Sequence, residues 1–167
     1  MRDRDPDLLI AGFRLWADDR DEHDPTDSYW HNCLQCRFRV ETGRSSVSDA
    51  VDLSAYDLAE FNDALTKAMA SLQGEAVLQA HESAALLLVR LSMKPHGHVE
   101  LYVESRSGDL AEHHGFLIDI DQSYVAPFAR QVRQLAAKFP PSGNERKWKR
   151  RSAGSSPILD FIFGKRS

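Results

Sequence analysis

The sequence predicts an α+β fold: a curved antiparallel sheet of about six to seven strands with two helices packed on one face. Several short segments alternate apolar and polar residues, which is typical of strands with one wet face. Two longer segments repeat apolar residues at steps of three and four, which is typical of one-sided helices. The order is three strands, a helix, four strands and a helix. Consecutive strands joined by short turns should pair antiparallel, and the helices should cover an apolar sheet face.

The first three predicted strands lie in the N-terminal third of the chain. Residues 8–16 form the first strand, and residues 17–26 form a loop, because dense acids and a proline cannot bury enough apolar area to become ordered. The second strand, residues 29–41, alternates most clearly. After a turn at Gly43, residues 45–53 form a weaker third strand. One face of the second strand consists of Trp30, Asn32, Leu34, Cys36, Phe38 and Val40.

The first helix begins after Ser54, which is predicted to cap it together with Asp57 three residues later. Gly74 ends this helix. Its apolar stripe consists of Leu58, Phe61, Leu65, Ala68, Met69 and Leu72. The next four strands are predicted at residues 75–82, 84–93, 97–105 and 115–121.

The second helix follows the last strand and stops before Pro140. Pro127 falls in its first turn, where a missing amide donor costs little. Its buried stripe is predicted to be Val125, Phe128, Val132, Leu135 and Phe139.

The bulk composition indicates one domain, residues 1–143. A chain of 167 residues with 42% hydrophobic and 28% charged residues is globular and long enough to bury its own core. The longest apolar run, residues 84–89, is too short to cross a bilayer, so we expect no contact with a membrane. The first residues mix acids with bases and lack the apolar core of an export signal, which predicts a cytoplasmic protein.

Charge is unevenly distributed along the chain. Residues 144–167 hold seven bases and two acids, whereas the remaining residues hold 14 bases and 23 acids. We predict a basic linker and an apolar C-terminal tail here, which could dock on the domain or join two copies in a homodimer. The run from Arg146 to Arg151 around Trp148 could also hold phosphates, but one short patch on an acidic protein would bind nucleic acid only weakly, which argues against a nucleic-acid partner.

Several short blocks resemble a known family. They are residues 72–78 (LQGEAVL), 97–101 (GHVEL) and 116–125 (FLIDIDQSYV), with an acidic residue, Glu82, between the first two. Together they resemble the WapI-type immunity proteins of bacterial polymorphic-toxin systems and related actinobacterial proteins of unassigned function. Residues 29–34 (YWHNCL) resemble another strand of that family, although Cys33 stands where Trp is more usual.

The resemblance covers residues 8–141. It implies a cytosolic antidote that binds and occludes a secreted toxin domain, in some systems a nuclease, with no chemistry and no cofactor. Two other classes remain open. One is a structural or regulatory module whose basic tail recruits an acidic or nucleic-acid partner. The other is an unrecognised hydrolase, which would need a deep pocket with perturbed carboxylates or histidines.

An acidic segment is the predicted partner-binding site. Its acids could present negative charge to the basic cleft of a nuclease and speed association. A calcium site and a solvated loop are the alternatives, although the spacing of an EF-hand is absent. The residues concerned are Asp18, Asp19, Asp21, Glu22 and Asp24.

The segment Asp121-Gln122-Ser123-Tyr124 joins the last strand to the second helix. We interpret it as a structural helix start, in which Asp121 or Ser123 accepts hydrogen bonds from first-turn amides. A catalytic acid with a tyrosine partner is the alternative. No nucleophile elbow, phosphate loop, metalloprotease helix or dinucleotide fingerprint occurs in the sequence, so we predict that the protein is not an enzyme and has no catalytic residues.

Cysteine and histidine spacing does not predict a metal site. Cys33 and Cys36 lie on a strand at odd spacing, which predicts two reduced thiols on opposite faces with Cys36 in the core. Four imidazoles could meet at one sheet end, but no fixed second shell or carboxylate spacing accompanies them. They belong to His96, His98, His113 and His114.

Overall fold

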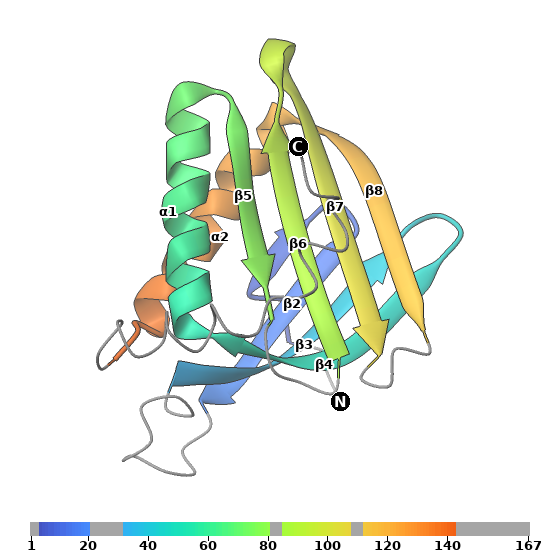
Figure 1. Ribbon diagram of the computed structural model, residues 1–167, viewed down its shortest axis with the longest axis vertical. Coiled ribbons are helices and arrows are strands. Elements are labelled where there is room, and N and C mark those ends of the chain that lie inside the picture. Colours follow the sequence, from blue (N-terminus) through green and yellow to red (C-terminus); the bar gives the residue numbers. More distant parts are fainter. Residues whose placement is uncertain (1–3, 21–31, 81–84, 108–111, 143–167) are drawn as a thin grey trace, which may run out of the picture.

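A computed structural model describes residues 4–20, 32–80, 85–107 and 112–142 of the chain. Within these residues, eight strands form two four-stranded antiparallel sheets, ordered β1-β2-β3-β4 and β5-β6-β7-β8. The first sheet contains β1 (Leu8–Ile10), β2 (Phe13–Arg20), β3 (Cys33–Glu41) and β4 (Ser46–Ser54). The second contains β5 (Gly74–Gln79), β6 (Ala85–Met93), β7 (His98–Ser107) and β8 (His113–Asp121). In Figure 1 the second sheet stands upright and the first crosses behind its lower part.

The α+β class predicted from the sequence is right, but the prediction of one curved sheet of six to seven strands is wrong. Helix α1 (Ala55–Ser71) separates β4 from β5, and these two strands do not pair. Each run of four consecutive strands therefore forms a separate sheet. The eighth strand arises because the segment predicted as one strand, residues 8–16, is a hairpin.

The first hairpin turns at Ala11 and Gly12. Ala11 has a φ of 48°, and the amide of Glu41 donates to the carbonyl of Gly12 at 2.9 Å. A Cβ atom on Gly12 would lie 1.9 Å from the Glu41 carbonyl oxygen, so no side chain fits there. After this turn, β2 continues to Arg20, and the loop predicted to begin at residue 17 is strand over its first four residues.

Helix α1 begins where predicted, because the Ser54 hydroxyl accepts a hydrogen bond from the Tyr56 amide at 3.1 Å. The helix ends at Leu72, which adopts the left-handed conformation and is 59% exposed rather than part of the buried stripe. Helix α2 (Val125–Lys138) packs on α1, and the rings of Phe61 and Phe128 meet edge to face at 6.2 Å. Figure 1 shows α1 alongside β5, with α2 behind it.

One core joins all these layers. It contains the inner faces of both sheets and the buried stripes of both helices, with Phe13, Phe38, Phe61 and Phe128 at 1% exposure or less. The helices are not stacked on one face of one sheet as predicted: α1 contacts β5, β4 and β6, whereas α2 contacts β1. Among the described residues, neither helix combines the length and apolar character needed to cross a bilayer.

Candidate functional site

The outer surface of the first sheet gathers arginines around a tryptophan. The pairing register sets Trp16 of β2 opposite Arg37 of β3, and Arg14 opposite Arg39. Side chains alternate along a strand, so these four residues lie on the face opposite to the buried Leu15 and Phe38 and their neighbours. Arg4 reaches the same surface and donates to the Ala17 carbonyl at 2.9 Å. We call this surface the arginine face: Arg4, Arg14, Trp16, Arg37 and Arg39.

Asp18 is already paired on the arginine face. Arg37 donates to both of its carboxylate oxygens, with Nε at 2.8 Å and Nη2 at 3.1 Å, and Arg4 lies 3.8 Å away. The hydrogen bond from Arg37 holds the pKa of Asp18 below its ordinary value. Arg4 also pairs with Asp7 at 2.7 Å. This part of the face is therefore locally balanced in charge.

Glu41 forms ion pairs with two arginines. Arg14 Nη1 lies 2.9 Å from Glu41 Oε2, and Arg39 Nη2 lies 3.4 Å from the same oxygen. The hydrogen bond from Arg14 lowers the pKa of Glu41. Arg39 keeps 46% of its side chain exposed. The Arg39 guanidinium thus makes a longer contact with Glu41 than Arg14 does, and it is accessible to solvent.

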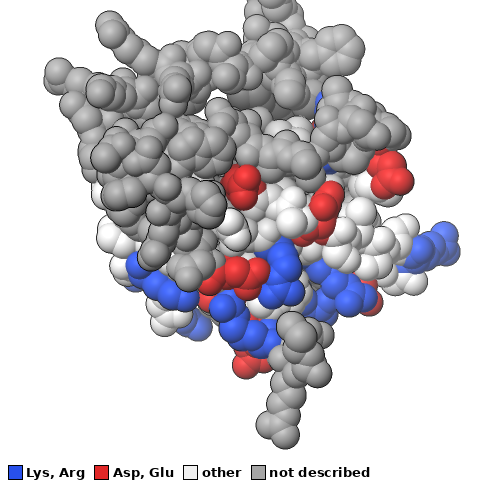
Figure 2. All heavy atoms as spheres, turned by 90° about the horizontal axis from the view of Figure 1, so that it is seen from below, with Lys and Arg blue, Asp and Glu red and all other residues white. Residues whose placement is uncertain are grey.

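A hollow of about 350 Å³ lies between these side chains. Trp16 and Ala50 supply apolar lining, and Arg4, Arg37 and Arg39 supply guanidinium groups. The Arg37 guanidinium carbon lies 5.9 Å from the Trp16 ring centroid. Seen from below, basic and acidic side chains are interspersed over the described surface (Figure 2). The arginine face therefore combines apolar, positive and negative contacts.

The predicted acidic site falls only partly within the described residues. Asp18 occupies an irregularity in the ladder between β2 and β3, and the backbone of Asp19 pairs with Gln35. Asp21, Glu22 and Asp24 lie outside the described residues. The apolar tail and basic run of residues 143–167 lie outside them as well.

Asp121 lies at the junction of β8 and α2. Its carboxylate accepts a hydrogen bond from the Ser123 amide at 2.8 Å and caps the 3-10 helix η3 (Gln122–Tyr124), which leads into α2. Hydrogen bonding to Ser123, chiefly from its backbone amide, lowers the pKa of Asp121. The side chain of Gln122 lies beside Gly97, and Tyr124 is 51% exposed. Asp121 lines a hollow of about 330 Å³ together with His96, His98 and Asp119, whereas Gln122, Ser123 and Tyr124 are not among the residues that line it.

The four histidines do not meet. His98 begins β7 and pairs with Asp121 at the end of β8, whereas His113 begins β8 and pairs with Arg106 near the end of β7. Antiparallel pairing places the starts of consecutive strands at opposite ends, so the two histidine pairs are separated by the length of the hairpin. Over the described chain, no three His, Cys, Asp or Glu side chains gather as a metal site would require.

Both cysteines are buried in the first sheet. Cys36 is 2% exposed, and burial raises the pKa of its thiol, with smaller contributions from Asp18, Asp52 and Asp7. A thiol with a raised pKa is a poor nucleophile and a poor metal ligand. The prediction that Cys36 lies in the core is right, although Cys33 is also buried, at 4% exposure.

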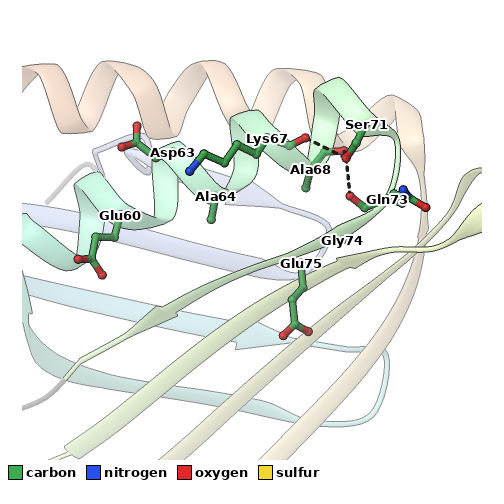
Figure 3. Close-up of a pocket in the computed structure, with 9 residues that line it drawn as sticks. All are labelled: Glu60, Asp63, Ala64, Lys67, Ala68, Ser71, Gln73, Gly74 and Glu75. Atoms are coloured by element: carbon green, nitrogen blue, oxygen red, sulfur yellow. Dashed lines mark hydrogen bonds between the residues drawn. The ribbon is translucent and has the colours of Figure 1, made fainter. Parts of the chain in front are cut away.

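A second hollow of about 430 Å³ lies between α1 and β5. Glu60 and Asp63 from α1 and Glu75 from β5 line it, together with Lys67. Figure 3 shows that the three carboxylates point in different directions and do not converge on one point. Converging groups are what general acid–base catalysis requires, so this groove lacks the arrangement of a reaction centre.

The model of the immunity protein WapI-like family matches residues 9–140, which is most of the chain. The chain belongs to the WapI-like immunity protein family. This confirms the resemblance seen in the sequence, and membership supports an immunity role. No curated protein matches the chain.

Solved structures with a distant similarity in shape come from plants. WHY1 from Arabidopsis thaliana has a TM-score of 0.48 at 11% identity, covering 79% of this chain and 87% of that one. The plant transcriptional regulator PBF-2 has a TM-score of 0.49 at 8% identity, covering 93% and 91%. WHY3 from Arabidopsis thaliana has a TM-score of 0.47 at 10% identity, covering 88% and 90%.

Sequence reasoning missed the arginine face of this WapI-like protein. The alternation of residues 29–41 places Arg37 and Arg39 on the wet face of their strand. Arg14 and Trp16 have the same spacing of two in the preceding strand, which was a usable signal. What the sequence does not contain is the register that sets the two pairs opposite each other.

Proposed function

We propose that this protein is the immunity partner of a bacterial toxin and acts by binding the toxin domain and covering its active site. The single observation that carries the proposal is the family match over residues 9–140. The protein acts in the cytoplasm, where an incoming toxin would reach its target. It uses no cofactor and no chemistry: occlusion needs only a rigid surface of complementary shape and charge.

The toxin domain is proposed to be a nuclease. Nucleases bind phosphate through basic clefts, and the acidic segment predicted to bind the partner would compete for such a cleft. Asp18 contributes little free negative charge, because Arg37 neutralises it at 2.8 Å. The attraction would therefore come from Asp19, Asp21, Glu22 and Asp24.

Co-expression tests the proposal directly. The probe is the C-terminal domain of a toxin encoded immediately upstream of the gene for this chain, expressed from an inducible promoter in a bacterial host. Cells that also express this protein should survive induction, and the purified pair should elute as one complex. The nuclease proposal predicts that the toxin domain degrades RNA or DNA in vitro and that an equimolar amount of this protein stops the cleavage.

Two results would count against the proposal in different ways. Death of the co-expressing cells, with soluble protein present, would exclude immunity against that toxin. Rescue of cells from a toxin domain without nuclease activity would keep the immunity role and remove the nuclease target.

A further inference from the structure

The arginine face contains more guanidinium groups than closely paired carboxylates. Arg4 and Arg37 have Asp7 and Asp18 at 2.7 and 2.8 Å. Arg14 Nη1 contacts Glu41 Oε2 at 2.9 Å, and Arg39 Nη2 lies farther from the same oxygen, at 3.4 Å. A guanidinium has five N–H donors and favours a carboxylate that it can contact through two of them. Arg39 therefore has donor capacity directed toward solvent.

Arg39 shares its hollow with an aromatic surface. Trp16 is partly buried, and its indole Nε1 donates to the Arg4 carbonyl at 2.7 Å, which fixes the ring on the sheet. The hollow that both residues line measures about 350 Å³, enough for one or two side chains. Tryptophan and arginine are the residue types that carry most binding energy in protein interfaces. Both stand on paired strands, so little ordering is needed when a partner arrives.

Charge on this face favours a protein over a nucleic acid. Asp18 and Glu41 lie between the arginines. A nucleic acid carries closely spaced phosphates, which these two carboxylates would repel. A protein surface can instead place one carboxylate at Arg39 and hydrogen-bond donors near Asp18 and Glu41. The interspersed charges therefore match a partner of mixed charge.

We infer that the hollow on the arginine face is the toxin-binding hot spot, and that its occupant is a toxin loop with a carboxylate for Arg39 and an apolar side chain for Trp16. This inference rests on the proposed function, because it names the surface and the chemistry through which the toxin is held.

The experiment measures binding of the same toxin domain by calorimetry with full-length variants. Trp16→Ala should raise Kd by about 30-fold or more, and Arg39→Gln by about 10-fold, the range expected when one anchor or one charged contact is lost. Arg133→Gln is the matched control, because Arg133 is exposed on α2, outside the arginine face. It should leave Kd unchanged.

A second measurement separates lost contacts from lost folding. Arg39 is 46% exposed, so Arg39→Gln should unfold at the wild-type temperature and should reduce the dependence of Kd on salt. Replacing the toxin's surface Asp and Glu residues one at a time by amides should reveal one carboxylate whose loss has no further effect in Arg39→Gln. That non-additivity identifies the group that Arg39 holds.

The outcomes distinguish failure of the proposed immunity function from failure of the inference about the arginine face. A wild-type protein that fails to bind the toxin overturns the immunity function and this inference together. Wild-type binding that both variants retain overturns the inference and leaves the function standing. Binding of a 20-nucleotide single-stranded oligonucleotide to the wild type, weakened in Trp16→Ala, would show that the hollow is a nucleic-acid site instead.

Discussion

Gly12 is the residue on which the first hairpin depends. Gly12→Ala would force the new methyl group against the Glu41 carbonyl, which stands 1.9 Å from the Cβ position. The strands must separate locally, and we expect a loss of about 1–3 kcal/mol in the free energy of unfolding. Urea denaturation followed by tryptophan fluorescence measures this loss. Gly43→Ala is the control, because nothing lies within 4 Å of its Cβ position, and a similar loss there would contradict the steric explanation.

Asp121 provides a prediction about pH. Its folded pKa is lowered by hydrogen bonding to Ser123, so the ionised carboxylate stabilises the folded state above the ordinary aspartate pKa. That contribution is lost as pH falls through the folded pKa. Asp121→Ala should therefore lower Tm at pH 7, and its difference from the wild type should shrink below about pH 4.

The control for this experiment is Asp119→Ala, two residues earlier on β8, which should barely change Tm. Binding of the toxin by the folded fraction of Asp121→Ala should persist, because Asp121 is proposed to be structural. Unchanged Tm together with lost binding would contradict that role.

At the residue level, local spacing in the sequence predicts helix caps and the buried positions of helices. Ser54 caps α1, and the predicted apolar positions of α2 from Val125 to Phe139 are buried. It does not predict which carboxylate is paired. Asp18 looks like one of several free acids in the sequence, and only the register of β2 on β3 reveals that Arg37 holds it.

Strand β7 buries a charged residue, Glu104, at 2% exposure. The Tyr102 hydroxyl donates to Glu104 Oε2 at 2.9 Å, and Arg106 donates to Oε1 at 2.6 Å. Tyr102→Phe removes the donor to Oε2 and leaves that oxygen buried without its hydrogen bond. We expect a loss of about 1–3 kcal/mol in the free energy of unfolding, measured by urea denaturation.

Tyr124→Phe is the matched control for that substitution, because Tyr124 is 51% exposed. Its effect should lie within about 0.5 kcal/mol of zero. Equal effects of the two substitutions would mean that the Tyr102 hydroxyl contributes nothing specific. The pKa of Tyr102 is raised by burial and by Glu104, so the hydroxyl remains a donor at neutral pH.

The acidic segment that begins in β2 provides a prediction about association rate. Changing Asp19, Asp21, Glu22 and Asp24 to Asn should slow association with the toxin at low salt, because fewer charges would attract a basic cleft. Stopped-flow fluorescence at two salt concentrations measures this rate. Asp18 is left unchanged, since its loss would remove the carboxylate that Arg37 contacts at 2.8 Å and confound the result. An unaltered rate at low salt would remove these acids from the interface.

Elements with long, one-sided patterns were predictable, and short turns were not. Both helices have apolar stripes that mark their extent, and six of the eight strands lie near their predicted positions. The hairpin at Ala11 escaped detection because its turn is too short to interrupt the apolar pattern of residues 8–16. Missing that turn removed one strand from the prediction.

At the level of the whole molecule, the sequence does not reveal how the two sheets are arranged. Local patterns give the faces of strands, whereas the division into β1–β4 and β5–β8 depends on which distant surfaces α1 and α2 cover. The tail, residues 144–167, is a separate question, because it lies outside the described residues.

Deleting residues 144–167 tests the proposal that the tail joins two copies. The full-length chain should sediment as a dimer and the shortened chain as a monomer, because the apolar residues near the end of the tail would be the contact. The shortened chain retains both helices and both sheets, so its Tm should change little. If the full-length and shortened chains sediment as the same oligomer, docking between chains through the tail is excluded.

The contact between β1 and α2 has a consequence for synthesis on the ribosome. The Leu9 amide donates to Gln131 Oε1 at 2.8 Å, across 122 positions of sequence. Strand β1 emerges before α2, which packs on it, so the nascent polypeptide must hold apolar residues such as Leu8 and Ile10 without their final cover until α2 has been made. The proposed protection against a toxin would therefore begin only after translation has passed α2.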